Sequence, residues 1–392
     1  MKVLVLGSGM MGSAIAFDLV KANDVEEILL TDIDEQRARS VSESLPTISR
    51  KATIRSARLD INYFDDVVSA MRGMDVAIGA VSYTQNYMLT KAAIESGTHF
   101  LDLGGNNEIV ERQLTLHPKA VAAKVCILPN CGLAPGLVNV LAASGAKRFD
   151  TIDEIHLRVG GLPQHPRPPL NYQLVFSPEG LINEYVEPAE VIRGGKIMHV
   201  ESMTDLEEIA FPPPFGTLEA FNTSGGLSTL PQMLEGKVRE LDYKTIRYKC
   251  HCEKFKTLLD VGFASNEPIM VGETVRTTRE VFTDLLRKKL DSNGPDVVLL
   301  RATISGTMGG EPRRDRGWQK TLAYEMLDYY DDVDNMTAMM RTTAFPTSIM
   351  AQMLGRGQIM THGVMPPEQC IPAEPLVQEL KNRNIVITEQ VT

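Results

Sequence analysis

The sequence predicts an α/β protein in which a doubly wound parallel sheet is interrupted by an inserted α+β domain with a mostly antiparallel sheet. Short apolar segments alternate with helical segments over the first 128 residues, as in a parallel sheet covered by helices on both faces. Longer alternating segments follow residue 150 without regular helices between them, as in antiparallel sheets. A chain of 392 residues also exceeds one ordinary domain.

The elements of the first domain follow from local pattern. Residues 3–6 form a continuous apolar run suited to a buried strand, and residues 13–22 have apolar side chains at helical spacing. Further strands are expected, in chain order, at 28–30, 54–59, 76–81, 98–103 and 125–128. Further helices are expected at 64–71, 87–96 and 109–124.

The second domain is predicted from strands with alternating side chains. These strands are expected at 152–159, 241–252, 297–307 and 320–330. The proline- and glycine-rich stretch 160–235 is expected to form ordered loops that face a substrate, because proline is excluded from central strands. A helix at 343–354 is expected to pack back on the first domain. The predicted domains are therefore 1–130, an insertion over 131–335, and a returning segment over 336–392.

Composition excludes several classes of protein. Hydrophobic residues make up 43% and charged residues 23% of the chain, which is typical of a soluble globular protein. No apolar run approaches the roughly 18 residues of a membrane span, and a net charge of −10 argues against nucleic-acid binding. Five cysteines, few and odd in number, indicate reduced thiols, and the N-terminus does not have the pattern of a signal peptide. We therefore expect a cytoplasmic protein.

A glycine motif follows the first expected strand. The segment Gly7-Ser8-Gly9-Met10-Met11-Gly12 has the G-x-G-x-x-G spacing and opens a helix. In a Rossmann-type fold these glycines allow a tight turn, close approach of a pyrophosphate and close packing of helix on strand. The motif predicts dinucleotide binding by residues 7–12.

Two aspartates end the next expected strands. Asp32 is placed to accept hydrogen bonds from ribose hydroxyls, and its negative charge favours NAD over NADP. Asp60 either borders the adenine or caps the helix at 64–71.

Polar residues also follow later strands, at the sheet edge where a nicotinamide would lie. Ser82 and Tyr83 follow one strand. We expect Ser82 to bind the cofactor and Tyr83, on the nicotinamide side, to be a catalytic residue. Asp102 could serve as a base, bind a substrate ammonium, or cap its own loop. Cys131 could donate a proton or contact the ring, or it could be a buried structural cysteine.

Three residues of the inserted domain are candidate substrate ligands. Arg247 alternates with apolar neighbours on an expected strand and could bind a carboxylate, although it could also be a solvated strand charge. Thr223 begins a segment of hydroxyls and glycines that could hold the same group. The aromatic ring of Tyr172 could form one side of the substrate pocket.

The segment Cys250-His251-Cys252 resembles a metal-binding motif but is not expected to be one. On a strand the two cysteines would point to one face and the histidine to the other, so the three could not converge on one ion. We expect no metal site.

Taken together, these segments resemble the saccharopine dehydrogenase-like family. The resemblance is carried by residues 1–32, 104–105, 129–136, 160–163, 172, 177–181, 215–229, 243–254 and 363–369. It implies NAD-dependent oxidative deamination of the side-chain amine of L-lysine, with hydride leaving the ε-carbon, release of ammonia and cyclisation of the semialdehyde. It also implies that the inserted domain mediates a homodimer or larger homo-oligomer.

The family's site residues correspond to positions already singled out. The resemblance places the nicotinamide-side loops at Tyr83 and at 130–132, with Asn130 near the substrate, and carboxylate binding at Arg247 and Thr223. A base must take the amine proton, and we expect Asp102 first, then Cys131 or His251.

Two alternatives stay open. A saccharopine reductase of the same family would need further cationic anchors, for which Arg158, Arg167 and Lys249 are candidates. A non-catalytic NAD(H) sensor would retain the fold without turning over any amine.

Overall fold

The computed structural model describes residues 1–46, 52–290, 294–309 and 318–392. The chain divides into two compact units. The first comprises Met1–Ser144 and Met340–Val386, and the second comprises Gly145–Met339 and Ile387–Thr392. The predicted insertion, 131–335, begins 14 residues before Gly145 and ends four residues before Met339, and Ile387–Thr392 join the second unit rather than the first.

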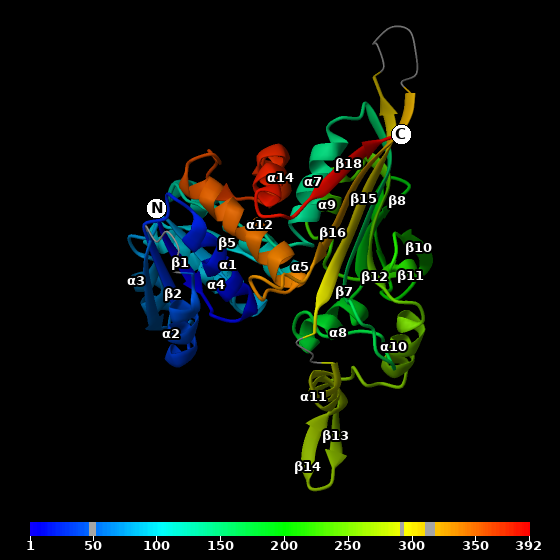
Figure 1. The fold of residues 1–392 in the computed structure, drawn as a ribbon, viewed down its shortest axis with the longest axis horizontal. Coiled ribbons are helices and arrows are strands. Elements are labelled where there is room, and N and C mark those ends of the chain that lie inside the picture. Colours follow the sequence, from blue (N-terminus) through cyan, green and yellow to red (C-terminus); the bar gives the residue numbers. More distant parts are fainter. Residues whose placement is uncertain (47–51, 291–293, 310–317) are drawn as a thin grey trace. The chain divides into compact units, whose positions relative to one another are not determined.

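The first unit contains a parallel sheet of seven strands in the order β17-β6-β5-β4-β1-β2-β3. Figure 1 labels β1, β2 and β5 of this sheet. The strands are β1 (Lys2–Leu6), β2 (Glu27–Asp32), β3 (Thr53–Arg58), β4 (Val76–Gly79), β5 (His99–Asp102), β6 (Cys126–Leu128) and β17 (Gly363–Val364). This order reverses between β1 and β4, so both carboxyl ends face the crevice where such sheets bind ligands. The Rossmann-type fold is confirmed.

Helices connect these strands. They are α1 (Met10–Lys21), α2 (Glu35–Ser44), α3 (Phe64–Met71), η1 (Tyr83–Gln85), α4 (Asn86–Ser96), α5 (Asn107–Leu114), α6 (His117–Ala122), α7 (Leu137–Ala146), α12 (Ala338–Gly355), α13 (Pro367–Cys370) and α14 (Ala373–Lys381). The single helix expected at 109–124 is two helices, since Pro118 starts a new one as its second residue. The aliphatic side chains of β1, β4, α3 and α4 bury a continuous core in this unit.

The returning helix α12 packs on α1. The rings of Phe17 and Phe345 stack with centroids 6.5 Å apart, and the Ser348 hydroxyl donates to the Asp18 carboxylate at 2.7 Å. The C-terminal part of the chain therefore completes the first unit, because α1 would otherwise expose these groups.

The second unit contains a nine-stranded mixed sheet whose main path is β10-β11-β12-β7-β15-β16-β18, with β8 and β9 joined at β12. The strands are β7 (Thr151–Pro163), β8 (Ala189–Arg193), β9 (Lys196–Val200), β10 (Glu207–Phe211), β11 (Gly216–Asn222), β12 (Val238–Arg247), β15 (Asp296–Met308), β16 (Trp318–Tyr329) and β18 (Ile387–Val391). Within this sheet, β7 and β12 are the only strands that pair in parallel among the pairs that the described residues form. The predicted antiparallel character is thus confirmed apart from this pair.

The stretch 160–235 was wrongly expected to lack regular structure. It holds β8, β9, β10 and β11 together with α8 (Pro178–Val186) and α9 (Leu230–Leu234). Its prolines fall at element ends: Pro163 ends β7, Pro178 starts α8, and residues 212–214 turn between β10 and β11. These prolines therefore lie at the ends of the strands and do not interrupt them.

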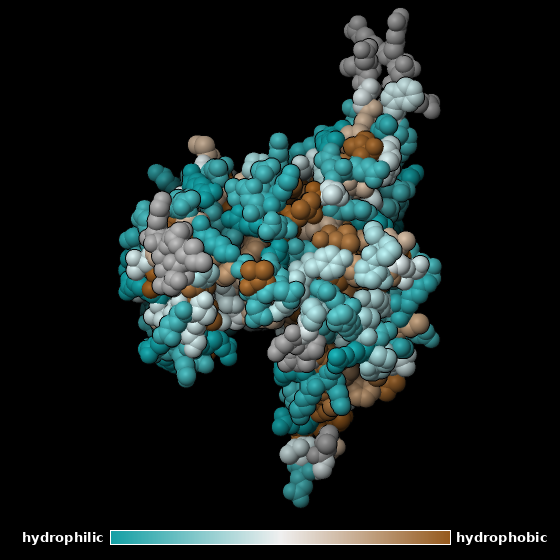
Figure 2. All heavy atoms as spheres, in the orientation of Figure 1, coloured by the Kyte–Doolittle hydropathy of each residue, from teal (hydrophilic) through white to brown (hydrophobic). Residues whose placement is uncertain are grey.

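Three helices and a hairpin complete the unit. They are α8, α10 (His251–Asp260) and α11 (Thr278–Leu290), with the hairpin of β13 (Pro268–Val271) and β14 (Thr274–Thr277). The helices share an aromatic core that includes Tyr185, Phe221 and Phe255. Apolar side chains gather on the surface over α11 and the hairpin in Figure 2, among them Met270, Val275 and Leu285. Within the described ranges, no helix is both long enough and apolar enough to cross a membrane.

Candidate active site

The turn after β1 carries the three predicted glycines. Gly7 has a φ of +96°, and a Cβ on it would lie 2.5 Å from the carbonyl oxygen of Ala80. A Cβ on Gly12 would lie 1.9 Å from the carbonyl oxygen of Gly7, whereas a Cβ on Gly9 would meet nothing within 4 Å. Gly7 and Gly12 thus permit close packing inside the protein, and Gly9 leaves the backbone open to a ligand.

The N-terminus of α1 suits a bound anion. Gly9 is its N-cap without a side-chain hydrogen bond, and the first turn holds no acidic residue. Met10 is half exposed and Met11 partly buried. Uncapped helix amides and the positive end of the helix dipole attract a phosphate. These residues therefore fit the pyrophosphate of a dinucleotide.

Asp32 lies beside this turn. Its Oδ2 accepts a hydrogen bond from the Ser8 amide at 2.8 Å, and its Oδ1 accepts one from the Asp34 amide at 3.0 Å. The carboxylate thus stabilises the glycine turn and lies where it could accept hydrogen bonds from the hydroxyls of a ribose. Asp60 accepts from the Asn62 amide at 3.0 Å, while the N-cap of α3 is Tyr63, so the helix-capping alternative for Asp60 is wrong.

Asp102 is fully buried at the end of β5. Its Oδ1 accepts from the amides of Gly104 at 2.8 Å and Asn130 at 3.2 Å, and its Oδ2 accepts from the Gln113 side chain at 2.7 Å. Burial raises the pKa of this carboxyl, against the lowering effect of these hydrogen bonds. The geometry favours the loop-capping alternative, in which Asp102 ties two strand-end loops together.

The neighbouring predicted residues occupy the same loops. Asn130 follows β6 with a φ of +63°, and Cys131 beside it is fully buried, with its thiol donating to the Leu128 carbonyl at 3.4 Å. Burial raises the pKa of the Cys131 thiol well above its usual value, which favours the structural alternative. Tyr83 lies against Gly105, whose Cβ would come within 3.1 Å of it, and Ser82 is exposed.

In the second unit, Arg247 is the last residue of β12 and is 2% exposed. Its guanidinium lies 4.7 Å from the centroid of the Tyr172 ring. The Nε donates to the Tyr185 hydroxyl at 2.8 Å, and one Nη donates to the Ile246 carbonyl at 2.9 Å. Since a guanidinium has five N–H donors, these two bonds leave an edge for a bidentate carboxylate.

A hydrogen-bonded chain fixes the orientation of Arg247. Burial and the charge of Arg247 lower the pKa of His251 to about 3, so its ring is neutral. Its Nδ1 donates to the Leu170 carbonyl at 3.0 Å, because a carbonyl can only accept. Its Nε2 therefore accepts from the Tyr185 hydroxyl at 3.1 Å, and the oxygen of that hydroxyl accepts from Arg247. His251 is thus a positioning residue.

The segment around His251 differs from its prediction. The strand ends at Arg247, Cys250 has a φ of +69°, and α10 begins at His251. The carboxylate of Glu219 accepts from the amides of Cys250 at 2.8 Å and Cys252 at 2.6 Å and so caps this helix. The strand premise of the metal argument was therefore wrong. No cluster of three or more metal-binding side chains occurs in the part of the chain that the structure describes.

Thr223 and Tyr172 lie with Arg247. The hydroxyls of Thr223 and of Thr245 on β12 are 2.7 Å apart, both buried. The Tyr172 hydroxyl is buried without a well-formed hydrogen bond among the described residues. A buried hydroxyl whose backbone contact, to Val175, is poorly formed marks a place where a polar ligand can bind beside a guanidinium with spare donors.

Glu184 joins this cluster and was missed by sequence reasoning. It lies on α8 directly before Tyr185, and its carbonyl accepts from the Ser224 amide at 3.0 Å. Burial raises the pKa of its half-buried carboxyl to about 7, although Arg247 lowers it. A signal was present in the sequence, because Glu184 falls one turn after Leu181, on the apolar face of its helix.

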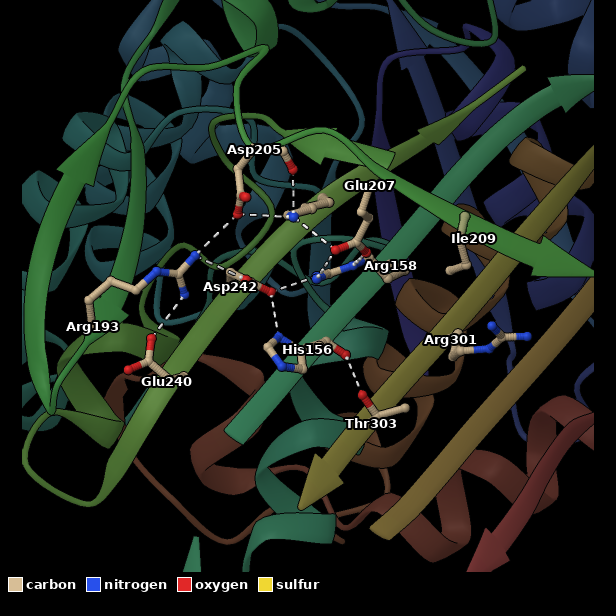
Figure 3. Close-up of a pocket in the computed structure, with 11 residues that line it drawn as sticks. His156, Arg158, Arg193, Asp205, Glu207, Ile209, Glu240, Asp242, Arg301 and Thr303 are labelled. Atoms are coloured by element: carbon tan, nitrogen blue, oxygen red, sulfur yellow. Dashed lines mark hydrogen bonds and ion pairs between the residues drawn. The ribbon is translucent and has the colours of Figure 1, made fainter. Parts of the chain in front are cut away.

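A charged cavity of about 500 Å³ opens on the opposite face of the same sheet (Figure 3). Alternation along β12 puts Asp242 and Lys244 on that face and Arg247 on the other. Arg158 donates to Asp242 at 2.6 Å, Lys244 to Glu207 at 2.8 Å, and Arg193 to Asp242 at 3.2 Å. These charges neutralise one another, so we assign the cluster to the stability of the sheet.

The predicted residues therefore form two sets, one in each unit. The first set surrounds the carboxyl ends of β1, β2, β4, β5 and β6. The second set comprises Arg247, Tyr172 and Thr223, to which the structure adds Tyr185, His251 and Glu184.

Comparisons with known proteins cover both units. Residues 3–128 match the saccharopine dehydrogenase NADP binding domain, and residues 132–386 match the saccharopine dehydrogenase C-terminal domain. The mitochondrial alpha-aminoadipic semialdehyde synthase of Rattus norvegicus is 23% identical over 464 residues, covering 100% of this chain and 48% of that protein. The chain thus spans about half the length of this relative.

Solved structures support the fold. The apo saccharopine dehydrogenase (L-Glu forming) from Saccharomyces cerevisiae superposes with a TM-score of 0.79 at 19% identity, covering 100% of this chain and 99% of that one. The homospermidine synthase of Legionella pneumophila, solved in complex with NAD, superposes with a TM-score of 0.65 at 12% identity, covering 100% and 91%.

Proposed function

The chain belongs to the saccharopine dehydrogenase family, and from that premise we propose that it is an NAD-dependent L-lysine 6-dehydrogenase. The two domains of the family match residues 3–128 and 132–386. The reaction takes a hydride from the ε-carbon and a proton from the ε-ammonium. Water then replaces the imine nitrogen, ammonia leaves, and the semialdehyde cyclises.

The observation that carries this proposal is that Arg247 is buried and has unused hydrogen-bond donors. It is a buried guanidinium fixed by Tyr185 and Ile246, with donors to spare beside Tyr172. A buried cation is costly unless a partner satisfies it, and the α-carboxylate of an amino acid is such a partner. Bound there, the carboxylate would orient the side chain of lysine away from β12.

The surroundings favour a substrate with one carboxylate. Saccharopine carries more carboxylates and needs further cations. Of the candidates, Arg158 is held by Asp242 on the opposite sheet face, Lys249 donates to Glu208 at 2.7 Å on the surface, and Arg167 is exposed. This distribution supports lysine over saccharopine.

Proton removal is the remaining requirement, since an ammonium has no lone pair to assist hydride departure. The candidate bases are already engaged in hydrogen bonds within the protein. These bonds involve Oδ2 of Asp102, the thiol of Cys131 and Nδ1 of His251. We therefore expect the rate to rise toward alkaline pH, where the ε-ammonium itself ionises.

Asp32 supports NAD as the cofactor, because a carboxylate beside the glycine turn repels a 2′-phosphate. A bound nicotinamide would supply the hydride acceptor. Gly9 and the first turn of α1 would hold its pyrophosphate, and Asp32 its ribose.

The test is NAD reduction at alkaline pH with L-lysine, L-ornithine and saccharopine, with ammonia measured in parallel. Lysine turnover with equimolar ammonia supports the proposal. Turnover of saccharopine with glutamate release would instead identify a saccharopine dehydrogenase. NADH binding without turnover of any amine would identify a sensor. The homo-oligomer stays a proposal, which light scattering tests.

A further inference from the structure

Glu184 and Arg247 are opposite charges in one buried cluster that do not form a direct ion pair with each other. The carboxylate of Glu184 interacts electrostatically with Arg247, but the Nε of Arg247 bonds to the Tyr185 hydroxyl instead, at 2.8 Å. A guanidinium and a carboxylate that do not pair directly in a low-dielectric setting can each be satisfied by a molecule that carries the complementary pair of charges.

The protein holds both groups in place. Tyr185 follows Glu184 on α8, so the bond from Arg247 to Tyr185 also fixes this turn of the helix relative to β12. The bond from the Ser224 amide to the Glu184 carbonyl ties the same turn to the loop that carries Thr223. The backbone of Glu184 therefore keeps a fixed position relative to Arg247.

We propose that Glu184 binds the α-ammonium of the substrate while Arg247 binds its α-carboxylate, so that this site selects free α-amino acids. This inference rests on the proposed function. The two charged groups of an amino acid sit on one carbon, which matches a cation and an anion that lie close together on β12 and α8. The reacting amine lies at the other end of the side chain, away from both.

Other ionisable groups face Glu184. They are Arg247 and Tyr243 on β12, Tyr185 on α8, Glu187 at the C-cap of α8, and Tyr172. Burial raises the pKa of Glu184 to about 7, with Arg247 opposing and Glu187 adding to the shift. Because an ionised carboxylate is needed to hold an ammonium, affinity for lysine should increase as the pH rises through 7.

The experiment compares three substrates in the full-length protein with NAD. L-Lysine has both charged groups, 6-aminohexanoate lacks the α-amine, and cadaverine lacks the carboxylate. We expect Glu184→Gln to lower kcat/KM for lysine about 10- to 100-fold and to leave 6-aminohexanoate within about twofold. Arg247→Gln should lower lysine and 6-aminohexanoate alike and spare cadaverine.

The matched control is Glu179→Gln, on the same helix. Glu179 is exposed and pairs with Arg287 at 3.0 Å on the surface. The ratio of lysine to 6-aminohexanoate turnover should not change in this variant. The increase in lysine affinity through pH 7 should persist in Glu179→Gln and disappear in Glu184→Gln.

Each outcome is decisive for one of the two proposals. If Glu184→Gln lowers both substrates equally, Glu184 does not bind the α-ammonium, and lysine turnover by the wild type still supports the proposed function. If the wild type turns over no amine, the proposed function fails, and calorimetry with L-lysine and NADH tests the site directly. Lysine binding that weakens in Glu184→Gln then supports the inference, and unchanged binding or no binding overturns it.

Discussion

The Nε of Arg383 lies 2.5 Å from the carboxylate of Asp18, although 365 residues separate them in the chain. Ser348 and Gln352 of α12 donate to the same carboxylate at 2.7 and 3.2 Å. Asp18 is 3% exposed, so the returning segment closes around a buried charge.

We expect Asp18→Ala to lower the free energy of unfolding of the first unit by about 3–5 kcal/mol, because it removes the buried partner of Arg383 and leaves only the partly exposed Glu379, at 2.6 Å. Asp24→Ala is the control. Asp24 pairs with Arg356 at 2.6 Å near the surface, and its loss should cost about 1 kcal/mol or less. Urea denaturation followed by circular dichroism measures both. Equal losses would contradict the prediction.

The glycine turn predicts two opposite phenotypes. Gly9→Ala should fold normally, since nothing lies within 4 Å of the added Cβ, but it should weaken NADH binding about 10-fold or more by obstructing the pyrophosphate. Gly12→Ala should destabilise the protein, because its Cβ would lie 1.9 Å from the Gly7 carbonyl oxygen. Thermal unfolding and NADH fluorescence titration separate the two effects. A Gly9→Ala variant with normal NADH affinity would show that no dinucleotide approaches there.

Asp32 should decide cofactor preference. Asp32→Asn retains an oxygen to accept the Ser8 amide, now 2.8 Å from the carboxylate, but removes the charge. We expect the ratio of NADPH to NADH affinity to rise about 10-fold or more, which corresponds to about 1.4 kcal/mol. Fluorescence titration with both reduced cofactors measures the ratio independently of turnover. A wild type that already prefers NADPH would refute the assignment of NAD.

The charge cluster on the opposite sheet face should make stability depend on pH. Burial raises the pKa of Asp242, but His156 and Arg158 outweigh it and hold that pKa below its usual value of 3.8. Its contribution is therefore present above pH 4 and is lost as the pH falls below. Burial lowers the pKa of His156, but Asp242 outweighs it and raises that pKa above 6.5, so its contribution is lost as the pH rises through the raised pKa.

We expect Asp242→Asn to remove both dependences and to lower the free energy of unfolding by about 3–5 kcal/mol at pH 6. Asp153→Asn is a control, because among the described residues the Asp153 carboxylate accepts one exposed hydrogen bond, from Gln319 at 3.0 Å. Urea midpoints at pH 3, 6 and 9 test the prediction. A wild-type profile that Asp242→Asn leaves unchanged would mean that the cluster does not contribute to stability.

Local features of the fold could be predicted from the sequence. The strand, turn and helix at residues 2–21 depend on contiguous residues, and so does the spacing from Gly12 to Asp32. The strands β8 to β11 could not be predicted, since prolines near the ends of these strands obscured the alternation of buried and exposed side chains along them. The start of α10 depends on Glu219, whose carboxylate comes from 31 residues upstream of Cys250.

The same limit applies to the candidate site. Arg247 was identifiable because it alternates with apolar residues on a strand. The role of His251 was not, since it depends on a hydroxyl 66 residues away. Asp102 was predicted as a candidate base because it is a carboxylate at a strand end. Only the folded chain shows that three hydrogen-bond donors already surround this carboxylate.

The strand β18 carries a consequence for how the protein should be handled. It pairs with β16 from Leu322 to Met326, and Thr392 exchanges backbone hydrogen bonds with Thr321. Without residues 387–392, the long strand β16 would present its unpaired amides and carbonyls as a template for another chain. A truncated protein should therefore be prone to aggregation through strand addition, even with its dinucleotide site intact.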